Sequence, residues 1–347
     1  MAKSAAPFHL APEKRGPAGY KQEMPERPKR SRAAAFIPDD VDNASVEVDG
    51  RRVALTNLRK VYFPQLGLTK GDLLRYYATV ADALIPHVAD RAMVMKRYPH
   101  GVTGDFFYMK RAPSPRPPWI RTCAIGHRSG NVIDFPVIDD RASLMWLINL
   151  GCIDLNPWYS RCDDPDRPLY LHFDLDPTPG ATFDVVREAA LIVRDVLQGI
   201  GMTPLVKTTG SKGVHIYVGI RSGPTQHEVW SVAKEIGHHI ARAHPDVLTA
   251  IYRVANRPTG RVLVDYNQNA FGKTLASIYS VRANEAAMVS TPVTWDELEG
   301  GCEPADFTIF NVPERIERLG DLWEPLLRNR GRFDLEKFGE RRTSAAV

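Results

Sequence analysis

Apolar and polar residues alternate most regularly over residues 169–177, LYLHFDLDP. Apolar side chains at every second position predict a β-strand with one apolar and one polar face. The polar face carries Tyr170, His172, Asp174 and Asp176. Neighbours on one face of a strand lie about 6.6 Å apart, so the two aspartates raise each other's pKa unless a positive charge lies between them. The pattern therefore predicts a strand whose polar face requires a cation.

The rest of the chain mixes short strands with amphipathic helices. Alternating or apolar runs predict a hairpin over 45–57, with Asp49-Gly50 at its turn, and strands over 204–209, 214–218 and 261–269. Helical spacing and capping residues predict helices over 69–88, 143–151, 181–201, 225–244 and 294–300. The Pro-rich segment 111–120 predicts a loop. This order predicts an α+β fold with a sheet whose strands carry the polar residues.

Length and charge suggest how the chain is organised. The 347 residues are 44% hydrophobic and carry a net charge of +4, which fits one large domain or two modest ones. The first 32 residues hold eight Lys or Arg against three Glu and are rich in Pro and Ala. We expect residues 1–44 to form a disordered basic arm, which either binds nucleic acid or only solubilises the chain. A catalytic domain with two sub-sheets is expected over 45–330, and a C-terminal tail over 331–347.

The sequence has no run of eighteen apolar residues, no apolar leader at its start and no CxxC pair among its four cysteines. We therefore expect no membrane span, no zinc site and a cytoplasmic location.

The first candidate site is the DxD pair of the strand over 169–177. Paired carboxylates on one face favour a hard cation such as Mg²⁺ or Mn²⁺. A site for two metal ions needs a further ligand, for which Asp265 in the strand over 261–269 is the candidate. The alternative is that Asp174 and Asp176 are only exposed carboxylates at a strand end.

The second candidate site is the turn within TTGSKGVHIYV. Its glycines bracket Ser211 and Lys212, and His215 follows in the next strand. Backbone N–H groups, the hydroxyl and the ammonium could together bind an anion. The alternative is an ordinary solvated hairpin.

Two further segments pair polar or aromatic residues with cations. In GDFFYMKR, Phe106 and Phe107 should point to opposite faces of a strand, and an exposed ring could stack on a base; the alternative is that both rings pack in the core. The segment 268–282 offers Gln268 and Arg282 to a triphosphate or a template, or is only a loop followed by a strand.

These blocks resemble a known family. FDLDP, TTGSKGVHIY and VLVDYNQN occur in the same order, followed by KT and YSVR, in the polymerase domain of bacterial ligase D, which belongs to the archaeo-eukaryotic primase superfamily. The resemblance covers residues from about 53 to about 325. It implies a primase-polymerase fold whose central mixed or antiparallel sheet bears the catalytic aspartates between flanking helices.

The resemblance also implies roles for individual residues. Metal binding and catalysis fall to Asp174, Asp176 and Asp265, which would bind two Mn²⁺ or Mg²⁺ ions. Nucleotide contacts fall to Ser211, Lys212, His215, Lys96, Gln268, Arg282 and Asn156. DNA contacts fall to Phe106, Phe107, Asn57, Lys60, Lys70, Arg257, His127 and Arg128, of which Asn57, Lys60 and Lys70 would bind a downstream 5′-phosphate. Two positions depart from the family pattern, because Asn156 replaces a histidine and Met109 a lysine.

The implied function is a metal-dependent nucleotidyltransferase that adds NTPs, in preference to dNTPs, to primer 3′ ends and fills short gaps in DNA repair. Its substrates would be gapped or primer-template DNA with a 5′-phosphate, and Ku or a ligase are candidate partners. Because no KxDG motif is present, we expect a stand-alone polymerase. Two alternatives remain open at this point: a catalytically weak DNA-end-binding module and a DxD glycosyltransferase.

Overall fold

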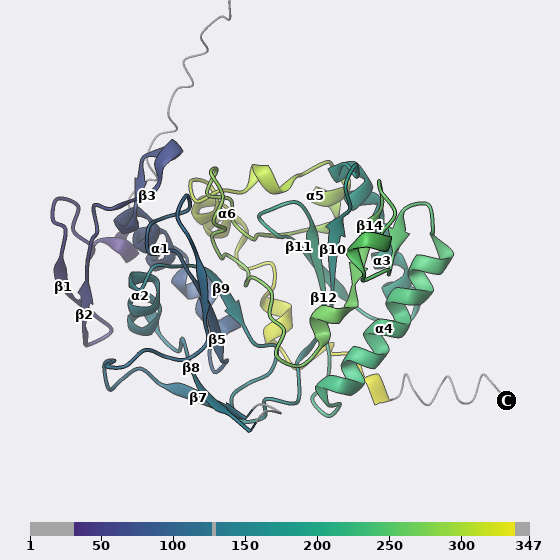
Figure 1. Ribbon diagram of the computed structural model, residues 1–347, viewed down its shortest axis with the longest axis horizontal. Helices are drawn as coiled ribbons and strands as arrows, with labels where there is room; N and C mark the ends of the chain where they lie inside the picture. The colour runs from purple at the N-terminus through teal and green to yellow at the C-terminus, as the bar shows by residue number, and fades with distance from the viewer. Residues whose placement is uncertain (1–30, 127–129, 337–347) are drawn as a thin grey trace, which may run out of the picture.

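The computed structural model describes residues 31–126 and 130–336, which form two lobes side by side (Figure 1). The N-terminal part of the chain forms one lobe around two helices, and a six-stranded sheet forms the centre of the other. Within the described residues, no helix is both long and apolar enough to cross a membrane.

The six-stranded sheet carries the strand over 169–177. Its strand order is β13-β14-β10-β12-β11-β15, and all neighbours are antiparallel except β13 and β14. Its strands are β10 (Tyr170–Pro177), β11 (Pro204–Thr208), β12 (Val214–Gly219), β13 (Leu248–Thr249), β14 (Val262–Asp265) and β15 (Pro292–Val293). Helices α3 (Phe183–Gly199) and α4 (Gln226–Ala243) pack on β10 and on each other. The predicted central mixed sheet with flanking helices is confirmed.

The other lobe is built from smaller sheets. A three-stranded sheet has the order β6-β5-β9, and three two-stranded pairs join β1 to β2, β3 to β4 and β7 to β8. Their bounds are β1 (Ala44–Val48), β2 (Arg51–Leu55), β3 (Val61–Phe63), β4 (Leu68–Thr69), β5 (Met93–Arg97), β6 (Phe107–Met109), β7 (Thr122–Gly126), β8 (Val132–Pro136) and β9 (Cys152–Pro157). The helices of this lobe are α1 (Lys70–Val88) and α2 (Arg141–Asn149).

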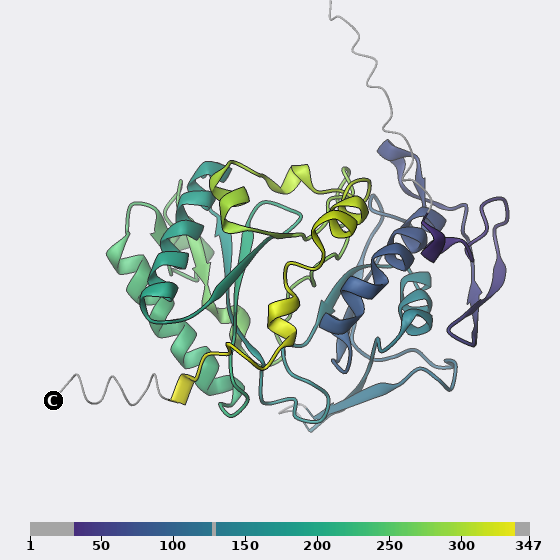
Figure 2. The ribbon, with the colours of Figure 1, turned by 180° about the vertical axis from the view of Figure 1, so that it is seen from behind.

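The C-terminal segment ties the lobes together. After β14 the chain forms α5 (Trp295–Glu299), α6 (Val312–Leu319) and the 3₁₀ helix η6 (Glu324–Leu327), and Figure 2 shows α6 and η6 between the two lobes. Helix α6 contacts α1, and the His87 ring lies 2.6 Å from the carboxylate of Asp321. One large hydrophobic core therefore runs through both lobes, with a smaller cluster under β7 and β8.

Local sequence signals explain most element starts. Thr69 and Asp72 form a capping box at the start of α1, and Thr225 and Glu228 form another at α4. The predicted hairpin turns between β1 and β2 at Asp49-Gly50, where both residues have positive φ angles. The predicted helices and strands are present, although the last predicted strand ends at Asp265 and continues as the 3₁₀ helix η4 (Tyr266–Asn269).

The packed domain is longer at both ends than the predicted bounds of 45–330. Before residue 44, Ala34 and Ile37 are buried and Asp39 pairs with an arginine of α1 at 2.7 Å. After residue 330, Phe333 bridges to β12 and Leu335 is buried. Apolar residues close to each predicted boundary were enough to bring these segments into the core. Residues 1–30 and 337–347 lie outside the described residues.

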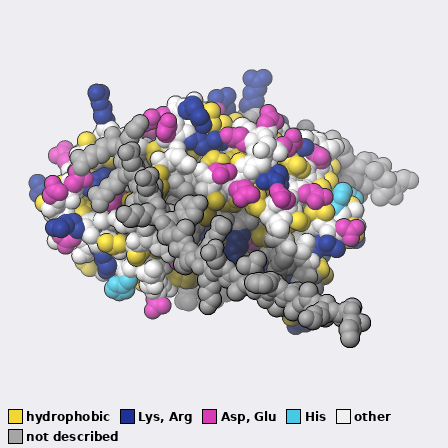
Figure 3. Space-filling view, turned by 90° about the horizontal axis from the view of Figure 1, so that it is seen from above, with side chains coloured by type: hydrophobic (Ala, Val, Ile, Leu, Met, Phe, Trp, Pro, Cys, Tyr) yellow, Lys and Arg dark blue, Asp and Glu magenta, His cyan; other side chains and the backbone are white. Residues whose placement is uncertain are grey.

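The surface mixes charges of both signs. Seen from above, acidic and basic side chains are interspersed over the described part of this face (Figure 3). The net charge of +4 is therefore not concentrated in one basic patch on this face. Local charged groups therefore say more about binding than the net charge does.

Candidate active site

The register of the six-stranded sheet brings the predicted acidic residues together. Asp174 on β10 lies directly opposite Asp265 on β14 and directly opposite His215 on β12. Asp176 lies two residues further along the same face of β10. The three aspartates therefore lie close together on two neighbouring strands of one sheet, near the C-terminal end of β10. In the sequence they are up to 91 positions apart.

The polar face of β10 is enclosed from Tyr170 to Asp174, contrary to the reading of Asp174 as an exposed strand-end carboxylate, and Asp176 at the end of the strand is exposed. His172 is fully buried, and Asp174 is 6% exposed. Burial, with the charge of Asp265 second, raises the pKa of Asp174 to about 7. The charge of Asp174, with burial second, raises the pKa of Asp176 to about 7. Asp174 thus raises the pKa of Asp176 as the sequence pattern predicts, whereas the charge that raises the pKa of Asp174 is that of Asp265.

Asp265 is held in place by its neighbours. Its carboxylate accepts hydrogen bonds from the backbone N–H of Asn267 and from Nε2 of Gln268, both at 2.9 Å. The Asn269 side chain bonds to the backbone of His172 on both its N–H and its carbonyl, at 3.1 and 2.7 Å. The side chain of Asn269 thus continues the pairing of β10 where β14 has ended. Gln268, predicted to touch the nucleotide, orients Asp265.

The donor set suits a hard divalent cation. Oδ1 of Asp174 is buried and has no hydrogen-bond partner within the described part of the chain, and all three candidate ligands are carboxylates, which Mg²⁺ and Mn²⁺ prefer. Within residues 31–126 and 130–336, however, no three acidic, His or Cys side chains form a ready-made metal cluster. The side chains are therefore of the right chemical type for a metal ion and lie near one another. The carboxylates would have to move closer together to bind the same ion.

His215 is a neutral ring. Its Nε2 lies 3.1 Å from Oδ1 of Asp174, a distance compatible with an ion pair, yet that oxygen has no hydrogen bond of acceptable geometry. Burial, followed by the charges of Lys207 and Arg282, holds the pKa of His215 well below its usual value. These two cations disfavour a second positive charge on the ring. His215 is therefore a polar neighbour of Asp174 and not a countercharge.

The turn between β11 and β12 is built differently from the predicted anion nest. The N–H groups of Ser211 and Gly213 already donate to the hydroxyl of Thr209, at 3.1 and 3.2 Å. These two donors are therefore engaged within the turn, which corrects the expectation that they would bind an anion. The side chains of Ser211 and Lys212 remain exposed, so anion contacts here depend on side chains.

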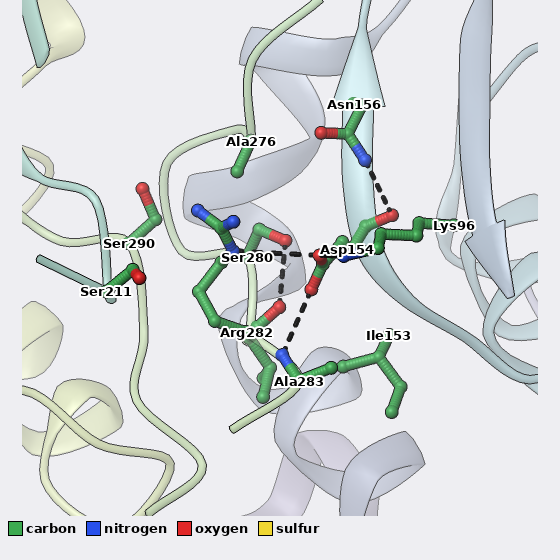
Figure 4. Close-up of polar contacts among 12 residues, drawn as sticks. Lys96, Ile153, Asp154, Asn156, Ser211, Ala276, Ser280, Arg282, Ala283 and Ser290 are labelled. Atoms are coloured by element: carbon green, nitrogen blue, oxygen red, sulfur yellow. Dashed lines mark hydrogen bonds and ion pairs between the residues drawn. The ribbon is translucent and has the colours of Figure 1, made fainter. Parts of the chain in front are cut away.

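A buried carboxylate that the sequence reasoning missed connects the predicted nucleotide-binding cations (Figure 4). Oδ2 of Asp154, on β9, lies 3.5 Å from Nζ of Lys96 and 3.7 Å from Nε of Arg282, while Oδ1 accepts a hydrogen bond from the N–H of Ala283. Burial raises the pKa of Asp154, and the charges of Arg282 and Lys96 oppose that rise. Asp154 thus joins the three-stranded sheet to the chain that follows β14.

Arg282 connects this cluster to the turn. Its Nη1 donates to the carbonyl of Thr209 at 2.8 Å, and the side chain of Asn284 donates to the carbonyl of Gly210 at 2.9 Å. Nearby, Lys207 is fully buried on β11, where Nζ donates to the carbonyl of Ala276 at 3.0 Å and also contacts Ser290. Burial lowers the pKa of Lys207 well below its usual value. Neither Asp154 nor Lys207 lies in a recognisable motif, so only their spatial neighbours identify them.

Comparison with known proteins now identifies the family. A model of the LigD primase-polymerase domain matches residues 69–323. The chain belongs to the LigD primase-polymerase family.

Similar proteins extend this result. The multifunctional non-homologous end joining DNA repair protein LigD of Mycobacterium tuberculosis H37Rv is 34% identical over 286 residues, which cover 80% of this chain and 37% of that protein. The bifunctional non-homologous end joining protein LigD of Bacillus subtilis is 30% identical, over 78% of this chain and 43% of that protein. The chain thus spans less than half the length of these relatives.

A solved structure shows the same fold. The polymerase domain of M. tuberculosis ligase D in complex with DNA is similar with a TM-score of 0.75 and 33% identity, covering 80% of this chain and 99% of that one. The predicted family and primase-polymerase fold are confirmed. The family match also favours a polymerase over a glycosyltransferase.

The aromatic pair of this LigD primase-polymerase lies at the surface. Phe106 is 50% exposed and Phe107 is 45% exposed, so packing of both rings in the core is wrong. Nζ of Lys96 lies 4.2 Å from the centre of the Phe106 ring, and the Arg97 guanidinium lies 5.2 Å from that of Phe107. Each exposed ring therefore has a cation beside it.

The predicted 5′-phosphate residues also lie together. Lys70 is buried and donates to the carbonyl of Thr56 at 2.6 Å, next to the exposed Asn57. Burial, followed by the charge of Lys60, lowers the pKa of Lys70 to about 8. Lys60 itself is only partly buried and donates to the carbonyl of Pro99 at 2.8 Å. The two lysines thus lie near each other, and Lys60 is the more accessible of the two to a phosphate.

The remaining predicted residues are dispersed. Arg257 is fixed by the carbonyls of Ile251 and Tyr252, and its charge lowers the pKa of Asp176, so it faces the acidic residues. The side chain of Asn156 donates to the backbone carbonyl of Asp154 at 3.1 Å. His127 and Arg128 lie outside the described residues.

Proposed function

We propose that this LigD primase-polymerase is a metal-dependent nucleotidyltransferase that extends primer 3′ ends and fills short gaps in DNA during end repair. One observation carries the proposal: Asp174, Asp176 and Asp265 lie together on neighbouring strands, and the charges of Lys207, Arg257 and Arg282 act on the first two. Nucleotidyl transfer needs this combination, because metal ions must be held beside a triphosphate.

Asp174, Asp176 and Asp265 are the residues that would hold the cations. Two Mn²⁺ or Mg²⁺ ions bound there would stabilise the attacking and leaving oxygens of the transfer. Gln268 and the N–H of Asn267 keep the Asp265 carboxylate oriented. The raised pKa values of Asp174 and Asp176 mean that both are ready to exchange a proton for a metal near neutral pH.

The chain's own cations would orient the triphosphate. Lys212 and Ser211 are exposed on the turn after β11, and Arg282 lies half-buried behind it. Asp154 fixes Arg282 relative to Lys96, which comes from the other lobe. Neutral His215 can contribute a hydrogen bond but no charge. The positive charge that balances the triphosphate would therefore come from lysine and arginine side chains.

DNA would lie against the N-terminal lobe. Exposed Phe106 and Phe107 offer faces for base stacking, and Asn57, Lys60 and Lys70 offer a cationic corner for a downstream phosphate. A preference for NTPs over dNTPs, recruitment by Ku or a ligase, and a place in the bacterial nucleoid are further parts of the proposal that rest on the family resemblance.

A primer-extension assay on gapped DNA with a 5′-phosphate, supplied with Mn²⁺ and either NTPs or dNTPs, tests the proposal. We expect the wild-type chain to add nucleotides, with NTPs favoured, and Asp265→Ala to lose at least about a hundredfold in rate, in line with the loss of a group that stabilises the transition state. Glu188→Ala, an exposed acidic position on α3, is the matched control and should keep full activity. A chain that binds the DNA without extending it would support the non-catalytic end-binding alternative.

A further inference from the structure

An open groove lined by arginines lies at the end of the six-stranded sheet remote from the aspartates. Arg161, Arg221, Ser222, Asn329 and Arg332 provide its polar lining. They come from the loop before β10, the segment after β12 and the chain after η6, which passes across the back of the molecule in Figure 2. β10 begins at this end and reaches Asp176 six residues later, so the groove and the acidic residues are about 20 Å apart along the strand.

Backbone carbonyls hold two of these guanidinium groups. Arg332 donates to the carbonyls of Arg328 and Leu326 at 3.1 and 3.2 Å, and Arg161 donates to the carbonyl of Ala89 at 3.2 Å. A carbonyl orients a guanidinium but does not neutralise it. The two side chains are therefore held in place with their charge intact, at the wall of an open groove.

The charges in this region repel one another. Arg91 lies fully buried behind the groove, where burial lowers its pKa, and the charges of Arg161 and Arg332 lower it further against an opposing effect of Tyr170. Burial lowers the pKa of Arg332, Tyr170 opposes that change, and the charge of Arg161 lowers the pKa further. Arg221 has the carboxylate of Asp334 at 3.3 Å as a counterion. An anion in the groove would relieve the repulsion among the other arginines.

Phosphodiester groups fit this groove best. Guanidinium groups match phosphate oxygens in geometry, and Ser and Asn side chains are common phosphate donors. The chain's own ends, residues 1–30 and 337–347, carry more basic than acidic residues, so charge disfavours them as occupants. A polymer with regularly repeated phosphates can reach the groove and the acidic residues at once, about six nucleotides apart at 3.4 Å each.

We propose that this arginine groove binds backbone phosphates of the DNA whose end is held at the aspartates, at least about six nucleotides from the reacting end. This rests on the proposed DNA substrate but not on nucleotide addition. The groove would lengthen the footprint on DNA without reading its sequence, because it offers phosphate contacts only.

Binding of gapped DNA with short or long duplex arms tests the proposal, measured by fluorescence anisotropy without nucleotides. The arms are about 4 or about 20 base pairs, so that only the longer DNA can span both sites. We expect Arg161→Gln/Arg332→Gln to weaken binding of the long DNA about tenfold at physiological salt and to reduce the slope of log K against log salt by about 2, one for each lost contact. Binding of the short DNA should not change.

Matched variants guard against trivial outcomes. Arg328→Gln, whose side chain pairs with Glu324 outside the groove lining, should bind both DNAs normally. If the double variant fails to fold, Arg221→Gln, with a 63% exposed side chain, replaces it and should lower the salt slope by about 1. Equal losses on short and long DNA would overturn the proposal. Loss of NTP binding in the double variant would also overturn it. So would an affinity for polyglutamate, but not for DNA, that depends on these arginines. None of these readouts needs the chain to be an active polymerase.

Discussion

Asp154 is the residue on which the two sides of the candidate active site depend. It lies on β9 of the N-terminal lobe, yet its carboxylate faces Lys96 of the same lobe and Arg282 of the other. Arg282 in turn bonds to the carbonyl of Thr209 in the turn that carries Ser211. A single buried carboxylate thus fixes the spacing of one cation from each lobe, the two cations proposed to contact a triphosphate.

Asp154→Asn tests this positioning role. The amide cannot balance two cations, so we expect the KM for the nucleotide to rise about tenfold, which corresponds to about 1.4 kcal/mol, with a smaller change in kcat. Asp154→Glu should restore part of the affinity. Asp184→Asn, at a side chain that is 80% exposed, is the control. Steady-state kinetics giving an unchanged KM in Asp154→Asn would remove Asp154 from this role.

The raised pKa values of Asp174 and Asp176 make stability depend on pH. Both values rise from 3.8 to about 7 on folding. Their contribution to the free energy of unfolding is fully present below about pH 4 and is lost as the pH rises through about 7, because the folded protein then holds two charges that repel each other, one of them on the buried Asp174.

We therefore expect the Tm of the metal-free protein to fall more steeply between about pH 5 and pH 8 than the Tm of Asp176→Asn. Mn²⁺ should raise the wild-type Tm at the upper pH and have little effect at the lower one, because it binds ionised carboxylates. Differential scanning fluorimetry measures both effects. The same dependence of Tm on pH in the two proteins would show that repulsion between these carboxylates does not destabilise the fold.

At the scale of elements, the hairpin of β11 and β12 is pressed against the aspartate strand. A Cβ atom at Gly213 would lie 2.2 Å from the carbonyl oxygen of Leu175, between the two aspartates of β10. A side chain at this position is therefore excluded by the backbone of the strand that carries the aspartates. The glycine is needed for close approach of two strands.

Gly213→Ala should consequently lower the free energy of unfolding by about 2–4 kcal/mol, in the upper range for single substitutions, and displace the aspartates enough to reduce nucleotide addition. Urea denaturation followed by circular dichroism measures the first effect. Gly199→Ala, at the end of α3 with open space around its Cβ position, should be neutral or slightly stabilising. Similar stability for Gly213→Ala and the wild type would show that the hairpin moves freely.

Sequence patterns predicted the elements well because the signals are local. The capping boxes of α1 and α4, the Asp-Gly turn after β1 and the alternation along β10 each depend on a few adjacent residues. The pairing of Asp174 with Asp265 was also within reach, because both lie in recognisable strands. The burial of the polar face of β10 was not, because its cover comes from distant segments.

The same limit explains what was missed in the site. Asp154 and Lys207 have no motif around them, and their importance comes from partners at least 58 positions away. The expected anion nest failed because the Thr209 side chain captures the N–H donors of the turn. Such competition between side chain and ligand depends on rotamers, which a residue pattern does not specify.

At the scale of the whole molecule, two lobes share one core, and Asp154 brings a cation of each lobe together. The C-terminal segment between the lobes helps to hold them together, with Asp321 bonded to His87 of α1 and to Tyr279. Nucleotide and DNA contacts proposed on different lobes would therefore keep a fixed spacing. This architecture explains why residues 69–323 match as one family unit.

The central claim is that three carboxylates from two strands bind metal ions together. Titration of Mn²⁺ into the metal-free protein, followed by isothermal calorimetry or electron paramagnetic resonance, tests it most directly. We predict that Asp174→Asn, Asp176→Asn and Asp265→Asn each weaken Mn²⁺ binding about tenfold or more, while Glu188→Gln binds like the wild type. Mn²⁺ binding that is unchanged in all three aspartate variants would contradict the account.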